Sequence, residues 1–450
     1  MGTVFVFCCL RWACATPLPN DAGVIPATVI PTDDDATLCE RGTNATVFVE
    51  ARVVALETVY RRRGTCNGVD TAQLLYDTYI IAGDFMRDAG SREVAIAYYE
   101  DAITLLPEGV IAQARLADLS PEVTETPSNS TCDTDTVRLP DYVPTEGNFA
   151  TLDDFGFLVN NAGYPIYGVN YYPSQSPFEK FLVETDLDAV ATEFGFIADA
   201  GLNTVRLFLH SDVLFVCDAL PNPSAFAMLE EIIRLADAVD LRLIMVLNVG
   251  VDAQSLFLDD VYAQQTDFIT QRYADESRIL AWDIYEIDSL DGTLLDAGLV
   301  WLADIVLRIR QADTAHPITV SWGTATGTTA PLVDFVSFQH VGSNEALRQT
   351  IANLQASTTR PLLLSSIGYS TFDVGEIAQR DNLFSAFDVA ENTDLMGWAV
   401  SWAFDFPRTA TCIPPDCPGE AQAINQFGLW NSTYFPKLSL EAITAQINGR

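Results

Sequence analysis

The chain has 450 residues, of which 49% are hydrophobic and 10% aromatic, so it can bury one or more large cores. Its 61 Asp and Glu far outnumber its 24 Lys and Arg, and the formal net charge is -37. A surface of this sign repels nucleic acid and anionic membranes, so we expect neither as a partner, and no stretch beyond the N-terminus is apolar enough to span a membrane.

Residues 1–15 have features of a secretion signal. An apolar run is followed by Ala13-Cys14-Ala15, an A-x-A pattern typical of a processing site, although Arg11 interrupts the run and no basic segment precedes it. A buried N-terminal strand is the alternative. We favour export, which predicts an extracellular or cell-surface location.

The cysteines and the glycosylation sequons fit an exported protein. The cysteines outside residues 1–15 are Cys39, Cys66, Cys132, Cys217, Cys412 and Cys417. Their even number is compatible with disulfides, and Cys412 and Cys417 bracket a loop short enough for a local bridge. Sequons begin at Asn44, Asn129 and Asn431. Because no C-x-x-C pair or histidine cluster accompanies the cysteines, we expect no metal and no cofactor.

An extended arm and a helical domain follow the signal segment. Residues 16–44 are rich in Pro, Thr and Asp and predict an arm or linker. The domain 45–118 contains a helical pair, from about Asp70 to Asp88 and from about Ser91 to Leu105.

The spacing within this pair resembles a tetratricopeptide repeat. Small side chains at Gly83, Ala95 and Ala102 allow the two helices to approach closely, and Tyr99 fills the groove between them. A generic helical hairpin packed on a neighbour is the alternative, since no second copy of the repeat follows.

We expect residues 16–118 to mediate self-association, because a lone helical pair cannot bury all its apolar side chains. The aromatic residues available for such contacts are Tyr76, Tyr79, Phe85, Tyr98 and Tyr99. Packing of the pair against the rest of its own chain is the alternative. The polar segment 119–149 is expected to be the linker to the next domain.

Residues 150–450 alternate between β-rich runs and helical patterns, which indicates a parallel sheet. The eight runs are 165–171, 203–209, 242–248, 279–286, 317–322, 334–339, 361–366 and 396–402. We therefore predict an α/β fold, a (β/α)8 TIM barrel with a small, mostly helical N-terminal domain. A doubly wound open sheet is the alternative, but no glycine-rich phosphate loop follows the first run.

Several segments of this region resemble clan A glycoside hydrolases, the superfamily of family 5 cellulases and mannanases and of family 72 glucanosyltransferases. GLNTVRLFLH resembles their second strand, with Arg206 at the arginine that supports the nucleophile. ILAWDIYEID resembles the fourth strand, RPLLLSSIGYST the seventh, and GWAVSWAFDFP the eighth, with Trp402 at a sugar-stacking tryptophan. The resemblance implies a TIM barrel and a glycan as the ligand.

The two catalytic positions of these relatives are altered. Retaining hydrolysis requires one carboxyl group to protonate the leaving oxygen and a second, roughly 5 Å away, to attack the anomeric carbon. In a gap-free alignment with the family pattern W-D-L-x-N-E-P, the acid position holds Ile287, and the nucleophile position in the seventh strand holds Ser366. We therefore predict that the chain is not an enzyme but a catalytically inactive relative that binds glycan or builds an extracellular assembly.

An active glycosidase or transglycosidase with relocated acids is the alternative. A shift of one residue would bring Glu286 to the acid position. Such a slip turns a strand side chain to the opposite face of the sheet, so a β-bulge would have to absorb it. A third alternative is a purely structural subunit in which the groove at the strand ends is vestigial and binds no glycan.

For glycan binding we select polar and aromatic side chains at or near the strand ends. These residues are Arg206, Tyr171, Trp322, His340, Tyr369 and Trp402. Packing at the end of the barrel is the alternative role for any single one of them. Asp212, Asp252 and Asp405 lie in turn contexts, where we expect a loop or helix-cap role rather than catalysis.

Overall fold

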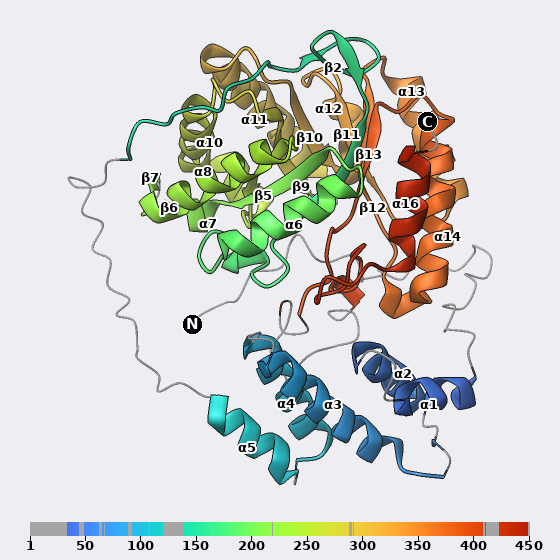
Figure 1. Ribbon diagram of the computed structural model, residues 1–450. Coiled ribbons are helices and arrows are strands. Elements are labelled where there is room, and N and C mark those ends of the chain that lie inside the picture. The colour runs from blue at the N-terminus through green and yellow to red at the C-terminus, as the bar shows by residue number, and fades with distance from the viewer. Residues whose placement is uncertain are drawn as a thin grey trace.

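The computed structural model describes two regions, a set of helices and a barrel (Figure 1). The described residues are 34–44, 49–62, 65–66, 68–88, 92–107, 109–119, 139–217, 219–287, 290, 292–407, 410 and 423–448. The signal segment 1–15, the sequon at Asn129 and the pair Cys412 and Cys417 lie outside these residues. Within the described part of the chain, no helix is both long and apolar enough to cross a membrane.

The N-terminal region is helical. Its described helices are α1 (Asp35–Thr43), α2 (Val49–Arg61), α3 (Thr71–Asp88), α4 (Arg92–Leu105) and α5 (Val110–Leu119). The predicted helical pair is confirmed as α3 and α4. The close approach of the two helices depends on Gly83, because a Cβ there would lie 2.4 Å from the ring of Tyr99. Helix α1 falls in the segment expected to be extended, and Asp34 begins it by accepting a hydrogen bond from the Thr37 amide.

The helical region has a hydrophobic core of its own. Tyr76, Tyr79, Tyr98 and Tyr99 are all buried in it, together with residues of α1, α2 and α5. The pair is therefore not alone, and of the five aromatic residues expected to be available for contacts only Phe85 is well exposed, at 55%. Self-association of residues 16–118 stays a prediction, but four of the five aromatic residues on which it rested are buried within the helical region itself.

A disulfide joins Cys39 of α1 to Cys66, which lies between α2 and α3. The even cysteine count had left this pairing open. Cys217, in the barrel region, is disulfide-bonded as well.

A short hairpin precedes the barrel and covers one end of it. Strands β1 (Thr151–Leu152), β2 (Phe157–Val159) and β3 (Ala162–Tyr164) pair antiparallel. The ring of Phe157 packs 5.5 Å from that of Phe335, inside a core that also contains Ile166, Ile244 and Leu363 from three barrel strands. The hairpin thus closes the N-terminal end of the barrel, on the side away from the helical region (Figure 1).

Eight parallel strands form a nearly closed barrel, as predicted. They are β4 (Ile166–Tyr171), β5 (Thr204–His210), β8 (Arg242–Val249), β9 (Ile279–Ile287), β10 (Ile318–Trp322), β11 (Val336–His340), β12 (Leu362–Ile367) and β13 (Gly397–Val400). Their order is β10-β9-β8-β5-β4-β13-β12-β11. The two end strands meet where the Asp334 amide donates to the carbonyl of Ile318 over 2.9 Å. Every strand matches one of the eight predicted runs.

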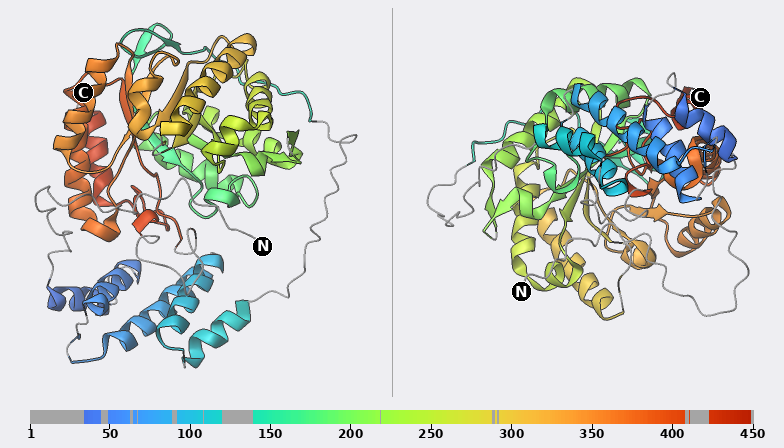
Figure 2. Two further views of the ribbon diagram at one scale, coloured as in Figure 1. Left: turned by 180° about the vertical axis from the view of Figure 1, so that it is seen from behind. Right: turned by 90° about the horizontal axis from the view of Figure 1, so that it is seen from below.

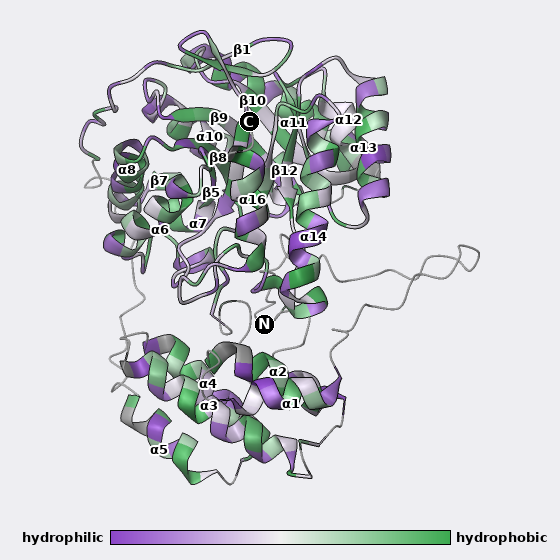
Figure 3. Ribbon diagram, turned by 45° about the vertical axis from the view of Figure 1, so that its right-hand side comes forward, coloured by the Kyte–Doolittle hydropathy of each residue, from purple (hydrophilic) through white to green (hydrophobic). Residues whose placement is uncertain are grey.

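Helices surround the strands (Figure 2). The long ones are α6 (Leu187–Asp199), α8 (Pro223–Ala238), α10 (Asp260–Arg272), α11 (Gly292–Ala312), α13 (Asn344–Ser357), α14 (Thr371–Glu391) and α16 (Leu438–Asn448). Shorter elements are α7 (Ser211–Leu214), α9 (Ala253–Leu258), α12 (Thr326–Thr329), the 3-10 turns at Phe178–Lys180 and Gly323–Ala325, and the strand pair β6 (Phe215–Val216) and β7 (Leu220–Pro221). Many of these helices carry both polar and apolar residues along their length (Figure 3), as expected where one face packs on strands.

The C-terminal ends of the barrel strands, which we call the barrel mouth, point toward the helical region. The guanidinium of Arg61 in α2 lies 4.4 Å from the ring of Phe372, which follows β12 in α14. In (β/α)8 barrel enzymes, the active site is formed by the loops at this end of the barrel. We therefore expect a functional site at the barrel mouth.

Candidate active site

Arg206 is the centre of a buried polar cluster near the barrel mouth. It lies on β5 with only 1% of its side chain exposed. Its Nη2 donates to Asp283 Oδ2 over 2.6 Å and to Glu286 Oε2 over 2.7 Å. Its Nη1 donates to Asn170 Oδ1 over 2.8 Å and to the carbonyl of Ser365 over 3.0 Å. A buried guanidinium is tolerated only with such partners, so the cluster is held as a unit.

Both carboxylates of this cluster come from β9, because that strand carries a β-bulge. In the register with β10, Thr319 lies opposite Asp283 and Ser321 opposite Glu286, so β9 contains one residue more than its partner. Without the bulge, alternation would turn residues three apart to opposite faces of the sheet. With it, Asp283 and Glu286 both face Arg206 in the barrel interior.

Ile287, the residue at the acid position in the gap-free alignment, lies opposite Trp322 in this register. It packs at the edge of the main hydrophobic core rather than on Arg206. The residue that ends the fourth barrel strand inside the barrel is therefore Glu286, as the alternative reading with a bulge required.

The two carboxylates differ in their exposure to solvent. Asp283 is fully buried, whereas 20% of the Glu286 side chain is exposed. Burial raises the pKa of Asp283 to about 6; the charge of Arg206 opposes this rise and that of Glu286 adds to it. Burial lowers the pKa of Arg206, but the two neighbouring carboxylates outweigh it and raise the pKa overall, so the guanidinium stays charged. A substrate entering the barrel mouth would reach Glu286 first.

The opposite side of the barrel mouth carries neutral groups. The hydroxyls of Ser366, on β12, and Ser401, after β13, lie 3.0 Å apart. Gln339 of β11 is opposite Ser366 in the register, and its buried Nε2 has no hydrogen-bond partner. Phe335, directly before β11, lies in the core at the bottom of the barrel, and Gln339 follows it by four residues, so alternation turns Gln339 to the interior as well. We call Gln339, Ser366 and Ser401 the β12 side, and Arg206, Asp283 and Glu286 the β9 side.

Sequence comparison gives no assignment: no protein-family model matches the chain, and no curated protein does. Comparison of structures identifies the fold. GH5_18 of Streptomyces cattleya, solved with GlcNAc and with Manβ1-4GlcNAc, matches 63% of this chain and 80% of its own, with a TM-score of 0.56 and up to 18% identity. The exo-β-1,4-mannosidase Op5Man5 of an Opitutaceae bacterium matches 66% of this chain and 62% of its own, with a TM-score of 0.56 and 16% identity.

A β-galacturonidase of Eisenbergiella tayi, solved with galacturonate, matches with a TM-score of 0.53 and 15% identity, over 67% of this chain and 54% of its own. The barrel has the fold of the clan A glycoside hydrolases. The resemblance seen in the sequence is thereby confirmed at the level of the fold.

The prediction that the chain is not an enzyme is wrong. It rested on Ile287 and Ser366 as the residues at the two catalytic positions. The matching structures are glycoside hydrolases, among them a mannosidase and a galacturonidase. In addition, the bulge in β9 supplies the barrel with Glu286 where the gap-free alignment had placed Ile287. At the second position, Ser366 remains without a carboxyl group.

Trp402 lies in an aromatic cluster at the barrel mouth. Its ring centre is 5.5 Å from those of Tyr172 and Phe208, and the ring of Phe208 lies 5.4 Å from the guanidinium of Arg206. The structure therefore connects two of the residues selected for glycan binding. Sequence reasoning missed His210, whose Nε2 lies 2.7 Å from the Tyr172 hydroxyl. Its position at the end of the second strand was the available signal.

His340 is the last residue of β11, and Tyr369 lies on the loop that follows β12. His340 Nε2 lies 3.0 Å from the carbonyl of Ser343, and the Tyr369 hydroxyl donates to the carbonyl of Gly342 over 3.2 Å. Burial lowers the pKa of His340 and raises that of Tyr369. Both residues are at the barrel mouth, beside the β12 side.

The structure does not bring Tyr171 and Trp322 to this place. Tyr171 is fully buried outside the barrel, where its hydroxyl donates to Glu193 of α6. Trp322 is also fully buried, and a Cβ on Gly298 of α11 would touch its ring. Each follows an inward-facing residue by one position, so strand alternation turns it toward the helices.

The remaining acids have structural roles. Asp252 caps α9 by accepting from the Ser255 amide, as expected, and Asp212 lies in the first turn of α7. Asp405 is paired with Lys437, Oδ1 to Nζ 2.6 Å, and burial raises its pKa to about 6 despite that charge. In the described part of the chain, no group of three or more His, Cys, Asp or Glu could hold a metal ion.

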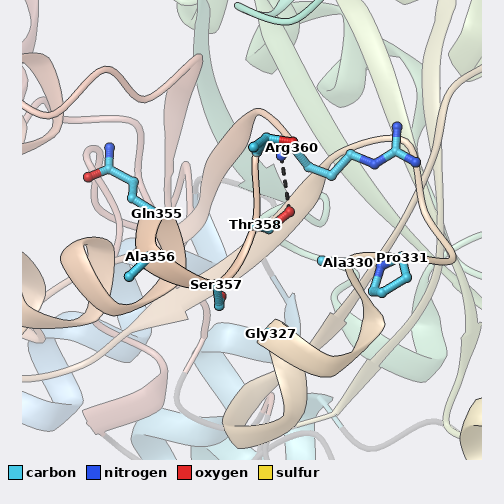
Figure 4. A pocket seen from close by; sticks show the side chains of 9 residues that line it. Gly327, Ala330, Pro331, Gln355, Ala356, Ser357, Thr358 and Arg360 are labelled. Carbon is cyan, nitrogen blue, oxygen red and sulfur yellow. Dashed lines mark hydrogen bonds between the residues drawn. The ribbon is translucent and has the colours of Figure 1, made fainter.

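A separate pocket lies beside the N-terminal end of β12 (Figure 4). Its lining residues are Gly327, Ala330, Pro331, Gln355, Ala356, Ser357, Thr358, Thr359 and Arg360. It contains no carboxylate and no histidine, and it is at the opposite end of its strand from Ser366. We assign no chemistry to it.

Proposed function

We propose that the chain hydrolyses β-glycosides at the barrel mouth, with Glu286 as the general acid that protonates the leaving oxygen. The observation that carries this proposal is the bulge in β9, which turns Glu286 onto Arg206 at the end of the fourth strand. The matching structures are consistent with a β-glycoside substrate: one is an exo-β-1,4-mannosidase, and another was solved with Manβ1-4GlcNAc.

Arg206 has two tasks in this proposal. Its two hydrogen bonds from Nη2 fix the positions of both carboxylates, since one planar guanidinium holds them at 2.6 and 2.7 Å. Its positive charge also offsets the negative charge that Glu286 acquires on giving up its proton. Asp283 supports this arrangement from below, where it also accepts a hydrogen bond from Ser321 over 2.9 Å.

Trp402 is proposed as the platform on which a sugar ring stacks. Its side chain is only partly buried, and four aromatic neighbours hold it: Tyr172, Phe178, Phe208 and Phe406. A fixed, partly exposed indole suits the apolar face of a sugar.

The test is turnover of 4-methylumbelliferyl β-glycosides carrying glucose, mannose or N-acetylglucosamine by the wild type and by Glu286→Gln. We expect Glu286→Gln to lower kcat by at least about a hundred-fold, the usual contribution of general acid catalysis. Glu231→Gln is the matched control, because Glu231 is an exposed residue of α8 paired only with Arg234 among the described residues, and it should leave kcat unchanged. Equal turnover by the wild type and Glu286→Gln would remove Glu286 from this role.

We also propose that the protein is exported and acts outside the cell or at its surface. The disulfide between Cys39 and Cys66 and the bonded state of Cys217 support this, because stable disulfides are typical of oxidising compartments. Fractionation of producing cells, with peptide mapping under non-reducing conditions, tests it. Recovery of the protein inside the cell with free thiols at Cys39 and Cys66 would contradict it.

A further inference from the structure

The two carboxylates of the site lie on the same side of the barrel mouth. Asp283 and Glu286 accept hydrogen bonds from the same nitrogen of Arg206, so both lie to one side of a bound sugar, and only Glu286 is exposed to it. Mechanisms with two carboxylates place them on either side of the scissile bond, as nucleophile or as base for water. The β9 side can therefore supply an acid, but its second carboxylate cannot attack from the opposite face.

Among the residues that the structure describes, the opposite side of the site does not supply the missing group. Strands β10 to β13, all of whose residues are described, contain no Asp or Glu. Of the nearby acids, Asp405 is bound by Lys437 and by the Gly428 amide, and Asp252 caps α9. A serine nucleophile would need a base, and Ser366 Oγ has the hydroxyl of Ser401 beside it rather than a histidine.

The β12 side instead offers hydrogen-bond donors to a neutral group. Ser366 and Ser401 have hydroxyls that can donate, and the Gln339 amide nitrogen has no partner. A serine side chain also has three heavy atoms fewer than a glutamate, so it leaves room for a substituent of the sugar. Because a hydroxyl accepts as well as donates, groups of this kind can also hold an amide through its N–H and leave the carbonyl oxygen free to react.

We propose that the substrate supplies its own nucleophile, an inference that rests on the proposed function. The sugar in the site is a 2-acetamido-2-deoxy-β-glycoside, and its acetamido group lies toward the β12 side. The acetamido oxygen attacks C1 while the bond from C1 to the glycosidic oxygen breaks. That oxygen keeps the bonding electron pair and takes the proton of Glu286. The product of this step is a cyclic oxazolinium ion and a free alcohol.

The second step restores the site. Water attacks C1, gives a proton to the Glu286 carboxylate, and the bond between C1 and the acetamido oxygen breaks with its electrons returning to the amide. The released sugar has the configuration of the substrate, because C1 is inverted twice. No oxidant, metal or further reactant is required.

The test is a series of 4-methylumbelliferyl β-glycosides of glucosamine with N-acetyl, N-difluoroacetyl and N-trifluoroacetyl groups, compared with the β-glucoside and β-mannoside. Fluorine withdraws electrons from the carbonyl oxygen and weakens it as a nucleophile, so we expect kcat/KM to fall by at least about ten-fold from acetyl to trifluoroacetyl, a loss of transition-state stabilisation. The first-formed sugar, observed by proton NMR, should be the β-anomer.

The outcomes separate this inference from the proposed function. Turnover of the glucoside or mannoside, but not of the N-acetylglucosaminide, that is lost in Glu286→Gln would overturn the inference and leave the proposed function standing. A fluoroacetyl series without a trend, or an α-anomer as the first product, would do the same. Absence of turnover for every β-glycoside would overturn both.

Ser366→Glu provides a second arm. A carboxylate at this position would occupy the room assigned to the acetamido group, so turnover of the N-acetylglucosaminide should fall at least about ten-fold relative to the wild type, again a transition-state effect. An unchanged melting temperature shows that the variant is folded. Ser366→Ala keeps the room but removes one hydroxyl, so it should lose less turnover than Ser366→Glu. Undiminished turnover by folded Ser366→Glu would contradict the inference.

Discussion

The two sides of the barrel mouth have the same backbone irregularity and opposite chemistry. On the β9 side, one extra residue between Asp283 and Glu286 brings a second carboxylate onto Arg206. On the β12 side, one extra residue between Leu364 and Ser366 likewise interrupts the register with β11, and the residue that follows is a serine. A bulge therefore decides which side chain faces the site, while the residue type decides what the site can do.

The difference in charge between the two sides predicts a difference in stability effects. Groups on the β9 side are buried, charged and interdependent, whereas those on the β12 side are neutral and partly exposed. Removing one member of a buried ion cluster leaves the others uncompensated, but removing one neutral hydroxyl does not.

Arg206→Met gives the largest expected effect. It leaves Asp283 and Glu286 without their positive partner, so the free energy of unfolding should fall by about 3–5 kcal/mol. Urea denaturation followed by circular dichroism measures it. Arg234→Met, which breaks an exposed pair with Glu231, is the control and should change the free energy by less than about 1 kcal/mol. Equal effects of the two variants would contradict a charged, interdependent β9 side.

Asp283→Asn tests the same side through pH. The pKa of Asp283 is raised to about 6 in the folded protein, above the ordinary value of 3.8 for an unfolded chain. The folded state therefore holds its proton more tightly, and the contribution of Asp283 to stability declines as pH rises from about 4 to about 6. Between about pH 4 and about pH 6, the free energy of unfolding should therefore decrease less in Asp283→Asn than in the wild type. Denaturation curves of identical pH dependence would exclude the raised pKa.

Ser401→Ala probes the β12 side and should have the smallest effect. It removes a hydroxyl that lies 3.0 Å from Ser366, a neutral interaction worth about 0.5–1.5 kcal/mol. The free energy of unfolding, measured as for Arg206→Met, should fall by no more than that. A loss as large as that of Arg206→Met would show that the two sides do not differ as described.

The sequence was sufficient for the barrel but not for the direction of every side chain in it. Alternating apolar runs and helices located all eight strands, and Arg206 and Trp402, whose role in glycan binding stays a prediction, both lie near the barrel mouth. Tyr171 and Trp322 also lie near strand ends, yet alternation points them at the helices. A gap-free reading placed Ile287 at the acid position because a bulge leaves no mark in the sequence of one strand; it is defined only by the register with a partner.

The helical region was likewise only partly predictable from the sequence. The pair α3 and α4 was predictable from its spacing, but the helices that bury its tyrosines come from segments with weaker patterns. Helix α1 lies in a polar segment that reads as an arm, and the disulfide from Cys39 to Cys66 connects it to the loop before α3. A cysteine count gives the number of bridges that can form and not their pairing.

The central claim, that the bulge in β9 makes Glu286 the general acid, is tested most directly by varying the leaving group. A 2,4-dinitrophenyl group departs without a proton, whereas a 4-methylumbelliferyl group benefits from one. For Glu286→Gln we predict that kcat/KM falls at least about a hundred-fold on the 4-methylumbelliferyl glycoside and less than about ten-fold on the 2,4-dinitrophenyl glycoside of the same sugar. An equal loss on both substrates would contradict the claim.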